Sequence, residues 1–420
     1  MKIIVSHPSI APHIKQTVVA YHKAGWLKYF YTAFFEHPKY SLSNFLSRFG
    51  SLKSLISRRK FHELPIEKFI SRPFPELLRS FSARKINPLV TDRVWEWAEL
   101  GFDKWVASSL LKNEIDIVHT YEHAALATLQ MAVKLNIFTV YEQSSQHHLS
   151  FLRMANKQFS CYPDLNSKAT DLLINKKAKR RNKRRDEELS IADLIICNST
   201  FTKKTLTDAG VNPERISVVP LGFPPVNRAY LERKKEDKCF VFMYAGNQSI
   251  SKGSHLLYEA WRKCNFPPEV AKLVLIGKMN LPEKTRENLP GNVSISNNIP
   301  HSELMELYKT ADVFLLPTLG DGFGMVVTEA MSNGVPVIAT TNCCGPDIIT
   351  HMKDGWIIPP DDVDALIEQM RWCITHESDL VHFKNASIKK ASEWQWSDYR
   401  NGLLNLINEK WLQSKKKQFV

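Results

Sequence analysis

Two carboxylates flank a glycine-rich turn in the second half of the chain. Asp321 precedes Gly322 and Gly324, and Glu329 follows eight residues after Asp321. The glycines let the backbone approach a ligand closely, because they carry no Cβ atom. Residues 326–332 can form a short helix whose first N–H groups would suit a phosphate. Both carboxylates could therefore point into one crevice, although an ordinary loop of a parallel sheet shows a similar pattern.

Length and composition indicate a globular protein of more than one domain. The chain has 420 residues, 44% of them hydrophobic and 24% charged, which favours two or three domains. It contains no run of eighteen apolar residues, so no transmembrane helix is expected. Seven cysteines without a CxxC motif predict free thiols in a reducing compartment. We therefore expect a cytoplasmic protein, with peripheral contact at the inner face of the membrane as an open alternative.

The formal net charge of +13 indicates an anionic partner. Eight basic residues crowd into the run 176–185, for which a solvated helix face is the plain explanation. Residues 40–110 alternate basic and bulky apolar side chains, a pattern of amphipathic helices that favours core packing over contact with a bilayer. An anionic membrane surface is the alternative for both basic patches, and an acidic glycan precursor is a further candidate partner for the net charge. Nucleic acid is a less favoured partner, because zinc-finger, RNP and basic-zipper spacings are absent.

The order of apolar segments predicts an α/β fold. Residues 2–6 form a predicted strand, followed by a loop and a helix over 13–24, which is how doubly wound domains begin. A further buried strand is expected to end at His119, with a helix beginning near Ala124. Residues 240–246 begin a second parallel sheet after a charged linker over 228–238.

The turn around Asp321 resembles the Glu-x7-Glu signature of family 4 retaining glycosyltransferases, with Asp321 in place of the first Glu. Residues 246–253 are similar to the family's G-R-x4-K-G loop. Lys252 stands where that loop has its Lys, and Asn247 stands where it has its Arg. The resemblance is strong over about residues 190–400.

This resemblance implies the GT-B fold, in which two Rossmann-like doubly wound domains face each other across a cleft. Residues 1–225 would form an N-terminal acceptor-binding domain, joined by a C-terminal helix within 394–420. Residues 238–393 would form the C-terminal domain that binds the nucleotide-sugar donor.

The resemblance also implies roles for individual residues. Glu329 would bind the ribose hydroxyls, Lys252 would balance the diphosphate, and Asp321 would contact the sugar or its charged centre. Asp321, Glu329, Lys252 and His123 are the implied catalytic residues. The implied donor-binding residues are Gly246, Asn247, Lys252, Gly277, Gly322, Phe323, Gly324, Met325, Val326 and Glu329.

Two histidine-containing loops resemble segments on the acceptor side of the family. Residues 115–126 are similar to its D-V-V-H-x-H-x(2)-H-A strand and loop, which places a His near the transferred sugar. His123 is the first choice for that role and His119 the second, with a core-facing His as the plain alternative. Residues 141–147 resemble a Y-E/D-R-G-S-x-H loop, with Gln143 replacing the Arg. The acceptor-side residues are then His119, Ser145 and His147.

The implied reaction moves a hexose with retention from a UDP- or GDP-sugar to a glycan or lipid-linked glycan, in surface polysaccharide biosynthesis. No cofactor or metal is expected, because in this family positive protein groups take the place of a metal. A sugar-nucleotide epimerase or hydrolase on the same fold is one alternative. The other is a catalytically weak GT-B protein that binds a polyanion; Asn247 and Asp321 favour it, whereas Lys252 and Glu329 oppose it.

Overall fold

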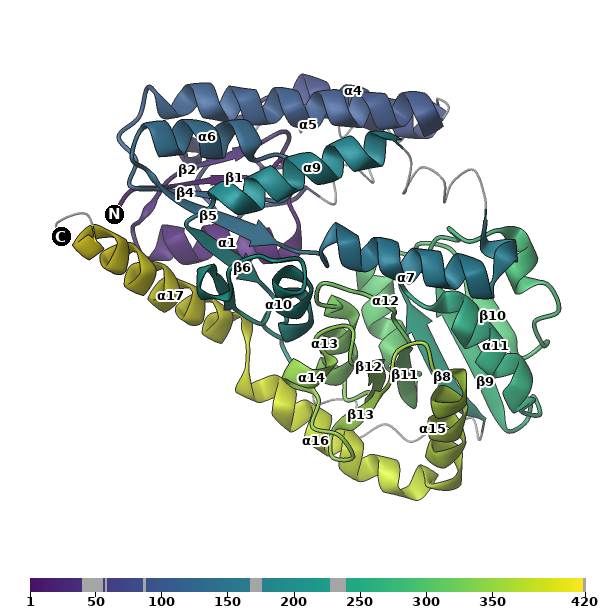
Figure 1. Cartoon of the computed structure of the whole chain (residues 1–420). Helices are drawn as coiled ribbons and strands as arrows, with labels where there is room; N and C mark the ends of the chain where they lie inside the picture. Colours follow the sequence, from purple (N-terminus) through teal and green to yellow (C-terminus); the bar gives the residue numbers. More distant parts are fainter. Residues whose placement is uncertain (40–55, 57–58, 86–87, 167–175, 227–238, 418–420) are drawn as a thin grey trace.

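The computed structural model describes residues 1–39, 56, 59–85, 88–166, 176–226 and 239–417, and it contains two separate parallel sheets (Figure 1). The first sheet has seven strands in the order β3-β2-β1-β4-β5-β6-β7. The second has six, in the order β10-β9-β8-β11-β12-β13. This architecture confirms the predicted fold class of two α/β domains. The predicted linker over 228–238 and much of the stretch 40–58 lie outside the described residues.

The N-terminal domain is built around the seven-stranded sheet, whose strands are short apolar runs, as sheets covered on both faces require. Its strands are β1 (Ile3–Ser6), β2 (Leu27–Thr32), β3 (Phe69–Ser71), β4 (Ile117–Tyr121), β5 (Phe138–Gln143), β6 (Leu194–Cys197) and β7 (Ile216–Val218). Its helices are α1 (Pro12–Lys23), α4 (Pro73–Lys85), α5 (Pro88–Leu110), α6 (Leu126–Lys134), α7 (His148–Cys161), α9 (Lys176–Ile191) and α10 (Thr200–Thr207), with 3-10 turns η2 (Ile66–Lys68), η3 (Pro163–Leu165) and η4 (Pro213–Arg215).

Helices cover both faces of this sheet (Figure 1). Successive side chains of a strand point to opposite faces, and β1 shows this alternation. Ile4 belongs to a buried cluster with Phe102 of α5. Ile3 and Val5 belong instead to the main core cluster, which includes Val18 of α1. The α4–α5 hairpin, α6 and α9 thus lie on one side, and α1 lies on the other.

The C-terminal domain repeats this arrangement around the second sheet. Its strands are β8 (Phe240–Ala245), β9 (Ala271–Ile276), β10 (Val293–Ser296), β11 (Val313–Leu316), β12 (Val337–Thr340) and β13 (Gly355–Ile358). Its helices are α11 (Ser254–Cys264), α12 (His301–Tyr308), α13 (Met325–Ser332), α14 (Gly345–Ile348), α15 (Val363–Thr375) and α16 (Leu380–Glu393), with 3-10 turns η6 (Glu283–Arg286) and η7 (Glu377–Asp379). Leu315 of β11 packs in a cluster with Trp261 of α11, and the adjacent Phe314 packs in the cluster that holds Val327 of α13.

Two helices tie the domains together. The last helix, α17 (Trp396–Lys417), returns to the N-terminal domain and packs on α1 (Figure 1). There the buried hydroxyls of Thr17 and Tyr399 lie 2.9 Å apart. Helix α7 extends in the opposite direction, onto the C-terminal domain. Gln158 of α7 donates a hydrogen bond of 2.8 Å to Asp361. These crossings hold the carboxyl ends of the two sheets against each other.

None of the helices within the described ranges is long and apolar enough to cross a membrane.

Candidate active site

Two cavities lie where the domains meet. The larger, of about 580 Å³, is lined by His123 and Arg185 from the N-terminal domain and by Lys252 and Asp321 from the C-terminal domain. The smaller, of about 230 Å³, is lined by His13 of α1 and again by Lys252 and Asp321. Because both cavities include this lysine and this aspartate, the two residues mark the point where the cavities adjoin.

Lys252 and Asp321 form an ion pair. Lys252 lies in the turn between β8 and α11, and Asp321 in the turn between β11 and α13. The backbone N–H of Leu319 donates a 2.8 Å hydrogen bond to the carbonyl of Ser251, which joins the two turns. The side chains of Lys252 and Asp321 keep 27% and 15% exposure, so a ligand in the cleft can reach both.

Gly322 lies at a close contact between the domains. A Cβ atom at this position would lie 1.8 Å from the carbonyl oxygen of Ser144, so no other residue fits without movement of the backbone. The Gly322 carbonyl accepts hydrogen bonds from Ser199 Oγ at 2.6 Å and from Thr202 Oγ1 at 3.1 Å. Its role is therefore to bring the glycine-rich turn against the N-terminal domain.

The N-terminus of α13 opens into the smaller cavity. Gly324 precedes the helix with φ = +89°, a left-handed conformation that glycine adopts without steric cost. Phe323, Gly324, Met325 and Val326 line this cavity, and no described side chain caps the helix. The N–H groups of a first helical turn have no carbonyl one turn before them, and the helix dipole favours an anion there. This part of the site can hold a phosphate group.

Glu329 faces α12 and lines neither of these cavities. Its carboxylate lies 3.0 Å from His301 Nε2 and accepts a 3.3 Å hydrogen bond from the buried Tyr308 hydroxyl. This contact with Glu329 raises the pKa of His301. Asp321 and Glu329 are thus on the same turn and helix, but they do not share one crevice.

The remaining predicted donor-binding residues have different surroundings. Gly246 lines the smaller cavity. Gly277 packs against it, since a Cβ on Gly277 would lie 2.0 Å from the Gly246 carbonyl oxygen. Asn247 is exposed and lines neither cavity, and its carbonyl accepts a 3.0 Å hydrogen bond from Tyr244. Gly277 therefore permits a close approach of two loops.

His123 lies in the cleft and His119 does not. The backbone of His123 has φ = +85° in the turn after β4, and partial burial in the cleft lowers the pKa of its imidazole. Its side chain is 44% exposed and faces the larger cavity. His119 is fully buried, between the Tyr21 hydroxyl at 2.9 Å and Glu142 at 3.2 Å. The structure corrects the acceptor-side assignment of His119, because β4 continues two residues beyond it to Tyr121 and encloses it.

In the loop after β5, one predicted acceptor-side residue lines the cleft and the other does not. Ser145 lines the larger cavity and donates a 2.8 Å hydrogen bond to Glu122. His147 is 4% exposed and lies outside both cavities, so its acceptor-side assignment is corrected as well. Its Nδ1 accepts the N–H of Leu149 at the start of α7. The adjacent His148 lines the cavity instead.

Two family models match the sequence. The model described as Glycosyltransferase Family 4 matches residues 69–226, and the one described as Glycosyl transferases group 1 matches residues 228–390. Together they span most of the chain.

The chain belongs to glycosyltransferase family 4.

Similar proteins include an MMP alpha-(1->4)-mannosyltransferase from Mycolicibacterium hassiacum, 30% identical over 49% of this chain and 51% of the relative. A second is the UDP-Gal:alpha-D-GlcNAc-diphosphoundecaprenol alpha-1,3-galactosyltransferase of Escherichia coli, 25% identical over 42% of this chain and 50% of the relative. The chain spans about half the length of the curated relatives that it matches. The structure resembles that of Anabaena Alr3699/HepE in complex with UDP, with a TM-score of 0.62, 16% identity and coverage of 97% and 100% of the two chains. This likeness confirms the GT-B fold.

Arg185 is a cleft residue of this family member that the motifs did not identify. Its guanidinium donates to Glu122 Oε2 at 2.8 Å and to Ser145 Oγ at 3.3 Å, and it lies 3.4 Å from His123 Nε2. The carboxylate of Glu122, 9% exposed, requires such a partner. An acidic residue directly after an apolar strand was the available signal for a buried ion pair. His13, at the start of α1, was missed as well.

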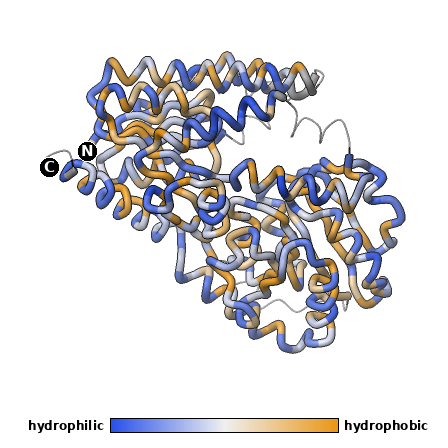
Figure 2. Tube along the Cα trace, viewed as in Figure 1, coloured by the Kyte–Doolittle hydropathy of each residue, from blue (hydrophilic) through white to orange (hydrophobic). Residues whose placement is uncertain are grey.

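Part of the basic run pairs with acidic residues of α5, whereas Lys179, Arg180 and Lys183 remain exposed to solvent. Helix α9 is strongly hydrophilic along most of its length (Figure 2). Arg180 pairs with Glu96 at 2.9 Å, and Arg181 pairs with Asp92 at 2.6 Å. Much of the charge of the run is therefore neutralised within the N-terminal domain.

Among the described residues, one group of side chains is spaced closely enough to hold a metal ion. The ligand atoms of His147, His148 and Asp186 lie within 4.8 Å of one another. His147 Nδ1 accepts a backbone N–H, so its ring proton is on Nε2, the nitrogen that faces Asp186 at 3.1 Å. A protonated Nε2 has no lone pair for a metal. This cluster therefore fits hydrogen bonding better than metal ligation.

Proposed function

We propose that this family 4 glycosyltransferase moves a sugar from a UDP- or GDP-sugar to a glycan or lipid-linked glycan in polysaccharide biosynthesis. The transfer retains the anomeric configuration and needs no metal ion. The observation that carries the proposal is the position of the Lys252–Asp321 pair at the junction of the two cavities. One cavity offers a helix N-terminus, and the other is enclosed by polar side chains of both domains.

The smaller cavity is the proposed diphosphate site. The N–H groups at the start of α13 and the ammonium of Lys252 are the positive groups that line it. As the bond between sugar and diphosphate breaks, negative charge grows on the departing oxygen, and fixed positive groups stabilise that charge. Asp321 would contact the sugar, and Glu329 would bind the ribose hydroxyls in competition with His301.

The larger cavity is the proposed acceptor site. His123, Ser145 and Arg185 line its N-terminal wall, and they are linked through the buried Glu122. Hydroxyl-rich acceptors bind to such arrays of donors and acceptors. Support for the ligand classes comes from the UDP bound to the Anabaena protein and from the diphosphoundecaprenol acceptor that the name of the Escherichia coli relative states.

The two alternatives, polyanion binding and the hydrolysis or epimerisation of the donor, would require different features of the site. A polyanion-binding protein would need available cations, but the larger cavity holds Arg181, Arg185 and Lys252, each paired with an acidic residue. A hydrolase or epimerase would consume donor without an acceptor. Transfer is favoured because the polar array around Arg185 lies outside the proposed donor cavity, where an acceptor is needed.

The test is isothermal titration of the protein with UDP, GDP and ADP in the presence of EDTA. We expect micromolar binding of one nucleotide, weakened in Glu329→Ala and in Lys252→Ala. Binding of that nucleotide identifies the donor class, and mass spectrometry with the matching donor then distinguishes transfer from hydrolysis. Absence of binding for all three nucleotides would overturn the proposal.

A further inference from the structure

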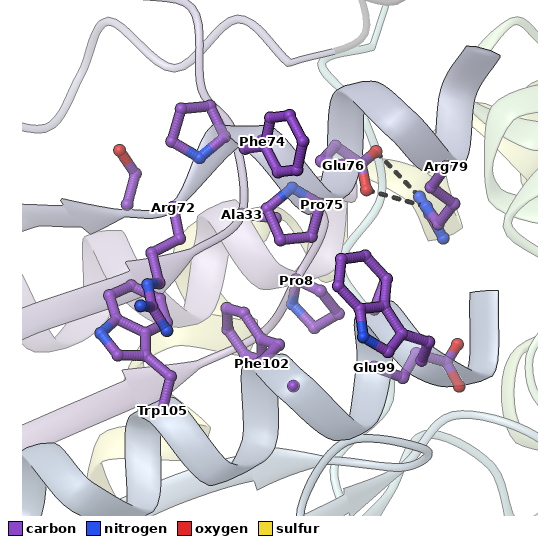
Figure 3. A pocket seen from close by; sticks show the side chains of 15 residues that line it. Pro8, Ala33, Arg72, Phe74, Pro75, Glu76, Arg79, Glu99, Phe102 and Trp105 are labelled. Carbon is purple, nitrogen blue, oxygen red and sulfur yellow. Dashed lines mark hydrogen bonds and ion pairs between the residues drawn. The ribbon is translucent and has the colours of Figure 1, made fainter. Parts of the chain in front are cut away.

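A third cavity lies in the N-terminal domain, beside the proposed acceptor site. It has a volume of about 470 Å³ and lies between the α4–α5 hairpin and the carboxyl ends of β1 to β3. Pro8, Phe74, Pro75, Phe102 and Trp105 surround it with apolar surface (Figure 3). Cavities of this size accept ligands of several hundred daltons, and their binding is dominated by the apolar lining.

One cation in the lining of this mainly apolar cavity has no acidic partner among the described residues. The Arg72 guanidinium lies 5.4 Å from the centroid of the Trp105 ring, a cation–π distance. No acidic side chain among the described residues pairs with Arg72. The other arginine of the lining, Arg79, is held by Glu76 at 2.8 Å (Figure 3). Arg72 is therefore the group on this wall that can receive an anion.

The cavity opens to the surface at one side and adjoins the active site at the other. Phe74 is 70% exposed and Trp97 is 52% exposed, so large aromatic surface lies in water at its edge. Exposed aromatic side chains at the edge of a cavity suit an apolar partner. Glu99 lines both this cavity and the larger cavity of the active site. Glu99 therefore marks the place where the two cavities adjoin.

We propose that this cavity binds the hydrocarbon chain of a lipid-phosphate-linked acceptor, with the phosphate at Arg72 and the glycan directed past Glu99 into the acceptor site. This inference rests on the proposed function, whose acceptor it narrows to the lipid-linked class. A free oligosaccharide or a nucleotide would leave polar groups unpaired against this lining. A chain that is apolar along its length and anionic at one end can pack its hydrocarbon against the aromatic side chains and pair its anionic group with Arg72.

Gly101 offers a direct test, because it lines the cavity and a Cβ atom there would meet nothing within 4 Å. Gly101→Leu would add a bulky side chain to the lining of the cavity, at a position where the Cβ atom itself meets no neighbour, in a helix that leucine favours over glycine. The probe is farnesyl phosphate below its aggregation concentration, titrated against tryptophan fluorescence. We expect binding that weakens at least about tenfold in Gly101→Leu, which corresponds to about 1.4 kcal/mol.

Further variants separate the chain from the phosphate. Arg72→Gln should weaken farnesyl phosphate binding but leave farnesol binding unchanged, and Phe74→Ser should weaken both. Arg153→Gln, an exposed arginine on α7, is the matched control and should change neither. Inorganic phosphate alone should not quench the fluorescence.

Nucleotide titration of the same variants distinguishes failure of this inference from failure of the proposed function. If Gly101→Leu keeps both its melting temperature and full affinity for farnesyl phosphate, the lipid site is overturned while nucleotide binding stands. The same conclusion follows if the wild-type protein binds a nucleotide but not farnesyl phosphate. Loss of the lipid probe in Gly101→Leu, with nucleotide affinity unchanged, supports the inference.

Discussion

The ammonium group of Lys252 is ion-paired with the carboxylate of Asp321, across two neighbouring turns at the carboxyl edge of the second sheet. A diphosphate entering the smaller cavity would compete with Asp321 for that ammonium. Before a ligand binds, the pair with Asp321 therefore keeps Lys252 in position. It also neutralises the charge of Lys252 in a partly closed cleft. Release of Asp321 by the diphosphate would also free its carboxylate to contact the sugar.

The two members of this pair should respond differently to substitution. Lys252→Ala removes a charge-assisted contact to the diphosphate, so the affinity for the nucleotide that binds should fall about tenfold to a hundredfold. Asp321→Asn removes the competitor and should maintain or increase that affinity, while sugar transfer falls. Isothermal titration gives the affinities, and product formation gives the rates.

Lys278→Ala, at an exposed lysine of the next loop, is the control. Equal loss of nucleotide affinity in Lys252→Ala and Asp321→Asn would contradict the assignment.

Gly322→Ala should impair catalysis by separating the domains at the glycine-rich turn. The new Cβ would collide with the Ser144 carbonyl, 1.8 Å away, so the turn must move away from the N-terminal domain. A displacement of about 1 Å in an active site can cost about a hundredfold in rate. We therefore expect transfer to fall at least tenfold, measured with saturating donor. Gly291→Ala, where a Cβ meets nothing within 4 Å, should keep full activity; a fully active Gly322→Ala would show that this contact is dispensable.

Local chemistry explains why much of the second domain could be predicted from the sequence. The helix expected over residues 326–332 is α13, which starts one residue earlier at Met325. Gly324 and Gly334, both with positive φ, set its two ends. These glycines and the apolar runs act over a few residues, so their effect can be recognised in a single sequence. The restart of the second sheet near Phe240 follows from the same local pattern.

The side chains that face the cavities depend on contacts that are distant in the sequence. Arg185 pairs with Glu122, 63 residues earlier in the chain, and no local pattern separates it from the other basic residues of its run. His119 and His123 have similar local sequence surroundings, but the length of β4 decides which is buried. The cavity beside Arg72 also forms only when four separate segments meet. These features follow from tertiary packing, which periodicity does not encode.

The contact between His301 and Glu329 should make stability depend on pH. Glu329 raises the pKa of His301 in the folded state, so the contact stabilises fully below the ordinary histidine value of about 6.5. This contribution disappears as the pH rises through the higher folded-state pKa. His301→Gln should therefore lower the melting temperature at pH 5.5 and have little effect at pH 9. The side chain is 67% exposed, so we expect a change below about 1 kcal/mol.

Thermal unfolding at the two pH values measures this difference directly. His382→Gln, on the exposed surface of α16, is the control and should show no pH-dependent change. A His301→Gln variant that is more destabilised at pH 9 than at pH 5.5 would reverse the expected sign and show that the charged imidazole does not stabilise the fold.

Arg185 and Glu122 should be energetically coupled, because both are largely buried, at 15% and 9% exposure. Burial favours the neutral form of Glu122, but Arg185, together with His123 and Ser145, outweighs burial and lowers the pKa of the carboxyl group. Arg185→Met leaves this carboxylate without its cation and should cost about 3 kcal/mol of stability. Glu122→Gln removes the buried negative charge that Arg185 neutralises. The double variant should therefore be more stable than the sum of the single effects predicts, by about 1–3 kcal/mol.

Urea denaturation of the wild type, both single variants and the double variant gives this coupling energy. The exposed pair Lys204–Asp208, whose side chains are 72% and 43% exposed, provides the matched cycle and should show a coupling of less than about 0.5 kcal/mol. A comparable value for both cycles would mean that burial does not strengthen the Arg185 pair. In that case the arginine would be available to an acceptor group, and Arg185→Met would reduce acceptor binding more than it reduces stability. Strong coupling assigns Arg185 instead to holding Glu122, Ser145 and His123 in place, and sugar transfer should then fall in Arg185→Met while nucleotide affinity stays unchanged.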